Sequence, residues 1–114
     1  MGSRKKAQGK TTSKPESFYS LSEVRELIGQ GKVWLKPNVL DDAQLDFGWG
    51  KSDILDALNK LKVGHFYKSD TSLKKRGVQL DFYKARGLKG EDVYTHFYID
   101  DKAGLLVVDS FKRL

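Results

Sequence analysis

The sequence contains no cysteine, only two histidines and two prolines, and no long apolar run. Without cysteine there can be neither a disulfide framework nor a thiolate metal site, and this fits a reducing compartment. No apolar stretch approaches the ~20 residues that a membrane helix needs, and the N-terminus lacks the apolar core of a signal peptide. Neither histidine has an acidic residue at ligand spacing. We therefore expect a cytoplasmic protein that has no metal, no cofactor and no membrane contact.

Positive charge is the first feature that is present, and it is unevenly spread. The 114 residues carry a net charge of +6. Residues 1–17 hold five basic residues and one acidic residue, and residues 62–114 hold eleven and seven, whereas residues 18–61 are mildly acidic. Because residues 1–17 have almost nothing apolar to bury, we expect a basic, disordered tail there and a single domain over residues 18–114.

Helical patterns occupy the first half of that domain. Ser20-Leu21-Ser22-Glu23 matches a capping box, and the apolar residues that follow it recur at helical spacing as far as Gly29. A short extended piece at 33–35 and a short helix within 38–45 come next. Ser52 is a suitable N-cap for another helix, which the pattern carries toward Gly64.

The apolar period changes to two after residue 65. Strands are predicted at 66–69, 78–84, 93–99 and 105–112, with a hairpin turn at 100–104. No helix-length segment separates the last strands, so they should pair antiparallel. The sequence thus predicts an α+β fold in which N-terminal helices cover one face of a mainly antiparallel sheet.

Polar residues alternate with apolar ones along these strands and should share the other face of the sheet. In the last strand, Leu106 and Val108 are expected on the same side as Ser110 and Lys112. The polar face is predicted to carry Gln79, Asp81, Tyr83, Tyr94, His96, Tyr98 and Lys112, together with Lys68 if its strand joins the sheet.

A face of lysines and tyrosines with no pair of carboxylates suits the binding and polarisation of phosphate. In RNA cleavage the ribose 2′-hydroxyl attacks the adjacent phosphorus, and cations stabilise the charge that develops there. A lysine with an ordinary pKa near ~10.4 is a poor base but a good cation at neutral pH, so Lys68, Lys112 and Arg86 are candidates for this task. Tyr94 is the candidate for handling the proton, and His96 competes with it as general base.

The run Lys74-Lys75-Arg76-Gly77 has two interpretations. It is either a solvated loop or a loop in which Lys75 and Arg76 contact the phosphate backbone. Two alternatives to an enzyme also stay open: a non-catalytic RNA-binding module, and a domain whose polar sheet face docks a protein partner.

The order of several short motifs resembles the MqsR-type toxins of bacterial toxin–antitoxin pairs, which are mRNA endonucleases with a RelE-like fold. The resemblance covers roughly residues 19–113. Its motifs are Gly31-Lys32-Val33, Phe66-Tyr67-Lys68-Ser69, Asp81-Phe82-Tyr83 with Arg86, Val93-Tyr94, and Val107-Val108-Asp109-Ser110-Phe111-Lys112.

This resemblance implies Lys68, Tyr94 and Lys112 as catalytic residues. The family also has a glutamine directly before its Asp-aromatic-Tyr motif, but Leu80 holds that place here and Gln79 lies one residue earlier. A slip of one residue reverses the face of a strand unless a bulge restores it, so Gln79 is kept as a candidate. Lys84, Tyr83 and His96 join Arg86 as candidates for RNA binding. The resemblance further implies cleavage of single-stranded mRNA and a cognate antitoxin.

Overall fold

The computed structural model describes residues 16–75 and 77–114. Its elements in chain order are α1 (Leu21–Gly29), β1 (Val33–Leu35), α2 (Pro37–Phe47), α3 (Lys51–Asn59), the 3-10 turn η1 (Val63–His65), β2 (Phe66–Thr71), β3 (Gln79–Leu88), β4 (Glu91–Asp100) and β5 (Leu105–Arg113). Residues 1–15 of the predicted tail, and Arg76, lie outside the described residues, so the predictions made for them stay predictions.

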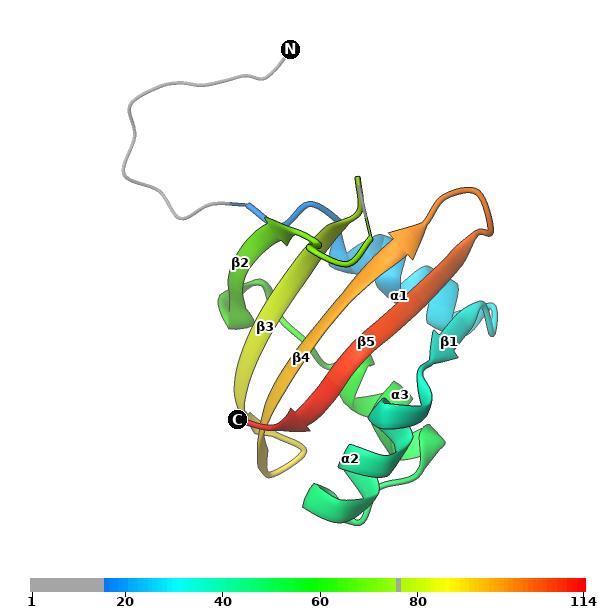
Figure 1. Ribbon diagram of the computed structural model, residues 1–114. Coiled ribbons are helices and arrows are strands. Elements are labelled where there is room, and N and C mark those ends of the chain that lie inside the picture. Colours follow the sequence, from blue (N-terminus) through cyan, green and yellow to red (C-terminus); the bar gives the residue numbers. More distant parts are fainter. Residues whose placement is uncertain (1–15, 76) are drawn as a thin grey trace, which may run out of the picture.

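The described strands form one sheet in the order β1-β5-β4-β3-β2. The four long strands pair antiparallel, and the short β1 pairs parallel with β5. In Figure 1 the helices lie on one side of this sheet and the other side is left open. The predicted α+β class, with helices preceding a mainly antiparallel sheet, is confirmed. We call the uncovered side of the sheet the open face.

Local capping decides where the helices begin. Ser20 Oγ accepts a hydrogen bond from the backbone N–H of Glu23 at 3.1 Å, so the predicted start of α1 is confirmed. The predicted N-cap of α3 is wrong, because Ser52 lies inside that helix. Gly50 precedes α3 instead, and its N–H donates to Asp53 Oδ2 at 3.2 Å. The helix ends at Asn59, well before Gly64.

Two tight hairpins set the register of the three central strands. The predicted turn between β4 and β5 is confirmed: the Asp100 carboxylate accepts the N–H groups of Lys102 and Ala103, both at 3.1 Å. The β3–β4 turn was not predicted. It has two residues, Lys89 (φ +52°) and Gly90 (φ +81°), and positive φ at both positions matches the twist of the flanking strands. β3 therefore extends to Leu88 and β4 starts at Glu91.

The core lies between the helices and the covered face of the sheet. Phe97 and Phe111 are fully buried there with Ile54 and Leu58 of α3. Tyr83 also belongs to this core, with 1% of its surface exposed and its ring stacked on Phe97 at 5.3 Å between centroids. Burial of this kind is the main source of the domain's stability.

The predicted orientation of β3 is wrong. Asp81 and Tyr83 face the helices, whereas Phe82 lies on the open face. Asp81 is buried because its carboxylate accepts the backbone N–H groups of Phe18 at 2.9 Å and Tyr19 at 2.8 Å. A buried carboxylate is tolerated when such donors satisfy it. Asp81 thereby ties the segment before α1 to the sheet.

The predicted orientation of β5 is wrong in its first half. His96 pairs with Ser110, but the next residue of β4, Phe97, pairs with Val108, so Asp109 is an extra residue in β5. This β-bulge reverses the alternation, and Val108 is fully buried in the core while Lys112 is exposed.

Within residues 16–75 and 77–114, each helix is too short to form a membrane span.

Candidate functional site

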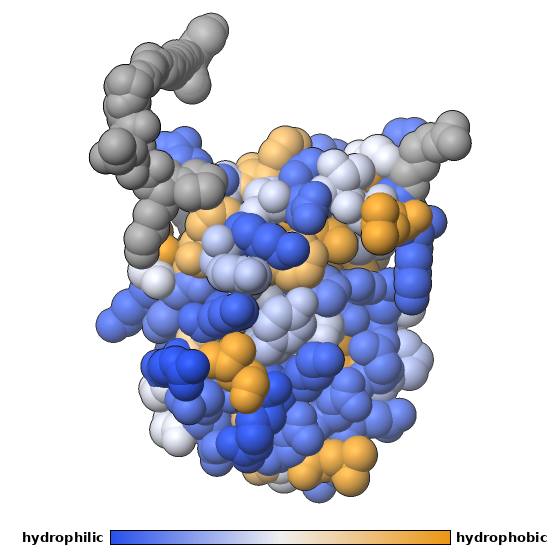
Figure 2. All heavy atoms as spheres, turned by 60° about the vertical axis from the view of Figure 1, so that its left-hand side comes forward, coloured by the Kyte–Doolittle hydropathy of each residue, from blue (hydrophilic) through white to orange (hydrophobic). Residues whose placement is uncertain are grey.

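The open face collects lysines and aromatic side chains from β2, β3, β4 and β5. β4 has the predicted orientation, with Val93, Thr95 and Phe97 buried and with Tyr94 and His96 on the open face. The view in Figure 2 brings the β2 edge forward and shows a mostly hydrophilic surface with small apolar patches. The open face carries Tyr67, Lys68, Phe82, Lys84, Tyr94, His96, Asp109 and Lys112.

Two β-bulges help to fill this face. In β2, Phe66 pairs with Tyr83 and Lys68 pairs with Phe82, so Tyr67 is the extra residue. In β5 the extra residue is Asp109. A bulge allows successive residues to project from the same side of a sheet. Tyr67 and Lys68 therefore lie on the open face together, as do Asp109 and Ser110.

Phe82 is the centre of the site. The ammonium of Lys68 lies 4.8 Å from the centroid of its ring, and the His96 ring lies 4.7 Å away between centroids. The Tyr94 ring is 6.5 Å from Phe82, and Lys112 Nζ is 5.6 Å from the Tyr94 centroid. The three residues implied as catalytic, Lys68, Tyr94 and Lys112, are thus brought to one face, with Phe82 between Lys68 and Tyr94.

Lys84 also reaches this face. Its Nζ lies 3.7 Å from the centroid of the Tyr67 ring, and Lys84 pairs with Tyr94 across β3 and β4. Aromatic rings flanked by cations can stack bases while the cations bind the phosphate backbone. The face therefore combines two chemical functions, stacking surfaces and phosphate-binding groups.

Tyr94 begins a chain of hydrogen bonds that runs along β4 and across to β5. Its hydroxyl lies 3.0 Å from His96 Nδ1, and His96 Nε2 lies 2.8 Å from Asp109 Oδ2. The other carboxylate oxygen of Asp109 is bound by the ammonium of Lys36, the residue before α2. Lys36 and Asp109 were not predicted as site residues. The Asp109 bulge, which brings the carboxylate to His96, leaves no mark in the apolar pattern of the strand.

The protonation of this chain follows from its surroundings. Burial lowers the pKa of His96, and this effect outweighs the opposite one of its hydrogen bond to Asp109, so the imidazole is neutral at pH 7. Burial and then the charge of Asp109 raise the pKa of Tyr94, so its hydroxyl keeps its proton. Burial alone would raise the pKa of Asp109, but Lys36 and His96 hold it below its ordinary value.

Two predicted site residues are not on the open face. Tyr83 is in the core, where burial raises its pKa to about 12. Gln79 lies on the covered side with Asp81, and its amide Nε2 donates to Ser69 Oγ at 3.0 Å. The position on the open face next to Asp81 is held by Leu80.

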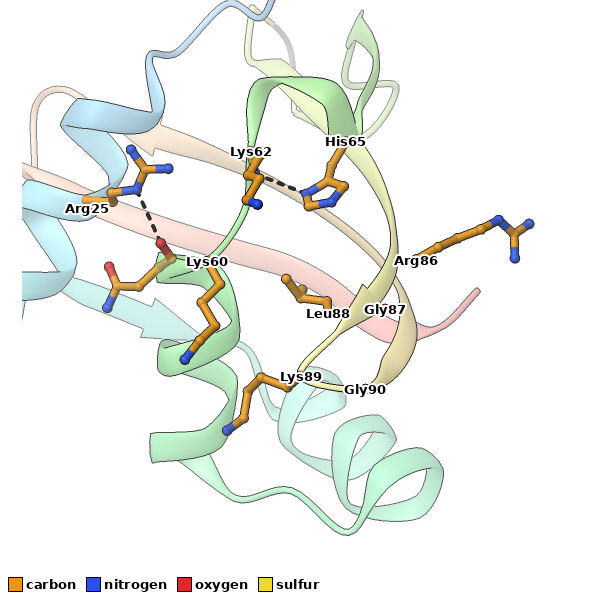
Figure 3. Close-up of a pocket in the computed structure, with 10 residues that line it drawn as sticks. Arg25, Lys60, Lys62, His65, Arg86, Gly87, Leu88, Lys89 and Gly90 are labelled. Carbon is orange, nitrogen blue, oxygen red and sulfur yellow. Dashed lines mark hydrogen bonds between the residues drawn. The ribbon is translucent and has the colours of Figure 1, made fainter.

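Arg86 lies apart from the other candidates, at the end of the β3–β4 hairpin. Its guanidinium pairs with Asp92 at 3.3 Å. It borders a pocket of about 550 Å³ between the hairpin, the middle of α1 and the end of α3, but in Figure 3 its side chain points away from that pocket. Other cations of the pocket are engaged inside the protein: Lys89 with Asp53 and Asp56, Lys60 with Asp56, and Arg25 with the carbonyls of Asn59 and Leu61.

Lys75 borders a second region of the open face. Its Nζ donates to Tyr98 Oη at 3.1 Å, and this bond raises the pKa of Lys75. A cavity of about 270 Å³ opens beside it, next to the Tyr94–His96–Asp109 chain. The cavity is lined by Lys36, Ser72, Lys74, Lys75, Val78, Leu80, Tyr98 and Asp109. Its three lysines make it a candidate site for a phosphate or an acidic group.

No cluster of three or more His, Asp or Glu side chains in residues 16–75 and 77–114 is arranged to hold a metal ion.

Comparison with known proteins gives one family. The model of that family, described as motility quorum-sensing regulator, toxin of MqsA, matches residues 16–113. No curated protein matches the chain. The matched range includes every residue of the open face.

Proposed function

Since the chain belongs to the MqsR toxin family, and is thereby the toxin of a toxin–antitoxin pair, we propose that it is a metal-independent endoribonuclease that cleaves single-stranded mRNA in the cytoplasm. Its partner is then a cognate antitoxin that neutralises it. The observation that supports this activity is the placement of Lys68, Lys84 and Lys112 around Tyr94 on the open face.

The proposed reaction needs only groups that this face provides. The 2′-oxygen of a ribose attacks the adjacent phosphorus and forms a cyclic phosphate, while the bond from phosphorus to the 5′-oxygen breaks. Tyr94 accepts the proton of the 2′-hydroxyl. Lys68 and Lys112 stabilise the negative charge on the phosphorane, and one of them protonates the leaving 5′-oxygen.

The rest of the open face is suited to binding a single strand on either side of the cleaved bond. Tyr67 and Phe82 offer ring faces for unpaired bases, and Lys84 binds a phosphate next to them. On the opposite side, Lys75 and the cavity that it borders receive a further nucleotide. A duplex keeps its bases stacked on one another and would not offer their faces to these rings.

The test of this function is incubation of the purified protein with a long single-stranded RNA in excess EDTA. We expect cleavage, with products that carry a 2′,3′-cyclic phosphate and a free 5′-hydroxyl, because the 2′-oxygen is the nucleophile. RNA in which each 2′-hydroxyl is methylated is the matched control, and it should be bound but left intact.

Two results would contradict the proposal. Cleavage only after addition of magnesium would exclude the metal-independent mechanism. RNA that is bound in a salt-dependent way but never cut would show a non-catalytic binding module instead.

The position of Gln79 gives a separate prediction. Because this side chain lies on the covered side of the sheet, Gln79→Ala should change kcat/KM for cleavage by less than about twofold. Leu80→Gln places an amide on the open face, where the family has one. It should raise kcat/KM by about 2- to 10-fold, the effect of one neutral hydrogen bond. The opposite pattern, a loss in Gln79→Ala and no gain in Leu80→Gln, would mean that Gln79 reaches the substrate.

A further inference from the structure

The hydrogen-bond chain behind Tyr94 has a defined direction. Asp109 is ionised and can only accept, so the proton between Asp109 and His96 belongs to His96 Nε2. A neutral imidazole carries one proton, so Nδ1 has a free lone pair and accepts from the Tyr94 hydroxyl. The oxygen of Tyr94 therefore keeps its own lone pairs free on the open face, while its proton already points toward His96.

Tyr94 alone is a poor base. Its pKa is raised, so almost no tyrosinate exists at neutral pH, and a neutral phenol that gained a proton would become a strongly acidic oxonium. Neither a tyrosinate nor an oxonium is needed if the phenol gives up its own proton as it takes the proton of the 2′-hydroxyl. His96 Nδ1 is placed to receive that proton at 3.0 Å.

Among the surroundings of His96, the Asp109 carboxylate stabilises the positive charge that this transfer would create, whereas burial and two lysines oppose it. From β5, the Asp109 carboxylate lies 2.8 Å from Nε2, and Lys112 is the opposing charge on the same strand. Lys36, before α2, contributes a second positive charge and also fixes the carboxylate in place. The ring of Phe82 from β3 covers the imidazole without contributing a charge. Of these groups, only Asp109 is in hydrogen-bond contact with the imidazole nitrogen that faces away from Tyr94.

We propose that His96 and Asp109 form a proton relay behind Tyr94, and this inference rests on the proposed endoribonuclease function. The 2′-hydroxyl proton passes to the Tyr94 oxygen as the bond from the 2′-oxygen to phosphorus forms, and the phenolic proton passes to His96 Nδ1. The result is a neutral tyrosine and an imidazolium paired with an ionised Asp109. A lysine protonates the 5′-oxygen as the bond from that oxygen to phosphorus breaks. After product release His96 gives its proton to solvent and the neutral lysine takes one up, so both groups return to their starting states. His96 and Asp109 are positioning residues, because they act through Tyr94.

The experiment compares wild type with His96→Gln, Asp109→Asn and the control His65→Gln, in kcat and KM as functions of pH. Glutamine at 96 can accept the Tyr94 hydrogen bond but cannot take its proton. His65 is the only other histidine of the chain, and it lies in η1 with its Nδ1 bonded to the N–H of Lys62. Replacing His65 removes the one alternative imidazole and leaves the open face untouched.

In wild type, kcat should fall as pH falls, with a midpoint below about 6.5, because a protonated His96 cannot accept another proton. His65→Gln should keep this fall of kcat at low pH. In His96→Gln, kcat should no longer fall at low pH, and it should be lower by about 10²-fold with little change in KM. Asp109→Asn should lower kcat and move the midpoint to lower pH, because the carboxylate that raises the pKa of His96 is gone.

A second measurement does not depend on cleavage. Nitrogen-15 NMR of the imidazole, assigned with His65→Gln, should find the proton of His96 on Nε2 in the wild-type protein at pH 7. A proton on Nδ1, or on both nitrogens, would overturn the relay. The relay would also be overturned if His96→Gln had the wild-type kcat and the same fall of kcat at low pH. In that case the endoribonuclease proposal would stand. A wild-type protein that does not cleave RNA at all would overturn both.

Discussion

Tyr94→Phe is expected to remove nearly all RNA cleavage while leaving the fold intact. The substitution deletes one hydroxyl and keeps the ring that contacts Lys112 and lies near Phe82. General acid–base catalysis by one group contributes about 10²–10⁴-fold, and kcat should fall by that factor. Single-turnover cleavage of a defined RNA measures the loss, and thermal unfolding of the variant should match that of wild type.

Replacing either of the lysines that flank Tyr94 should lower kcat by a comparable factor. Lys68→Ala and Lys112→Ala each remove a cation aimed at the phosphorane, and one such donor contributes about 10²–10³-fold. Lys51→Ala, on the exposed surface of α3, removes the same charge at a distance from the open face and is the matched control. If Tyr94→Phe and both lysine variants cleave at the wild-type rate, the open face is not the catalytic site.

Asp81→Ala is expected to cause the largest loss of stability among the polar substitutions considered. The carboxylate accepts two backbone N–H groups, and an alanine would leave the buried N–H of Tyr19 and the partly buried N–H of Phe18 without this partner. Hydrogen bonds to a charged acceptor contribute about 1.5–3 kcal/mol each, so the free energy of unfolding should fall by about 3–5 kcal/mol. Chemical denaturation measures this change directly.

Two further variants separate the role of those bonds from the loss of one negative charge. Asp81→Asn keeps one acceptor oxygen, and its loss should be intermediate. Asp70→Ala removes an exposed carboxylate from the neighbouring strand, whose pair with Lys68 at 3.6 Å should contribute less than about 1 kcal/mol. Equal effects of Asp81→Ala and Asp70→Ala would contradict the role assigned to Asp81.

The sequence correctly predicts the elements in which local capping or turn signals agree with the hydrophobic period. Ser20 identified the start of α1, and Gly104 identified the β4–β5 hairpin. In β4 the alternation of Tyr94 and His96 with buried neighbours gave the correct face. The order of these elements was enough to predict helices on one side of an antiparallel sheet.

The sequence-based prediction of which face each β3 residue occupies is wrong, because hydrophobicity does not decide the orientation of that strand. Phe82 is more apolar than Asp81, and the pattern therefore placed Phe82 in the core. The structure reverses this choice, since a backbone segment more than sixty residues earlier in the chain satisfies the Asp81 carboxylate. A contact over that distance leaves no periodic signal, and it moved Tyr83 and Gln79 away from the open face.

The chain of Tyr94, His96 and Asp109 was missed for a related reason. β5 is apolar on both sides, so a single extra residue at Asp109 does not disturb its pattern. The same holds for Tyr67 in β2, where the extra residue adds an aromatic ring to the open face. Bulges are a property of strand pairing, and a single strand does not reveal them.

The order of the strands has a consequence for the folding of this protein during synthesis. β5 is the last strand to be made, yet it lies between β1 and β4 and supplies both Asp109 and Lys112. Until β5 has left the ribosome, β1 has no partner strand, α2 lacks the strand on which it mainly packs, and the site lacks two of its charged groups. The open face is therefore complete only once β5 has paired with β1 and β4, and this pairing is the last step in assembling the candidate site.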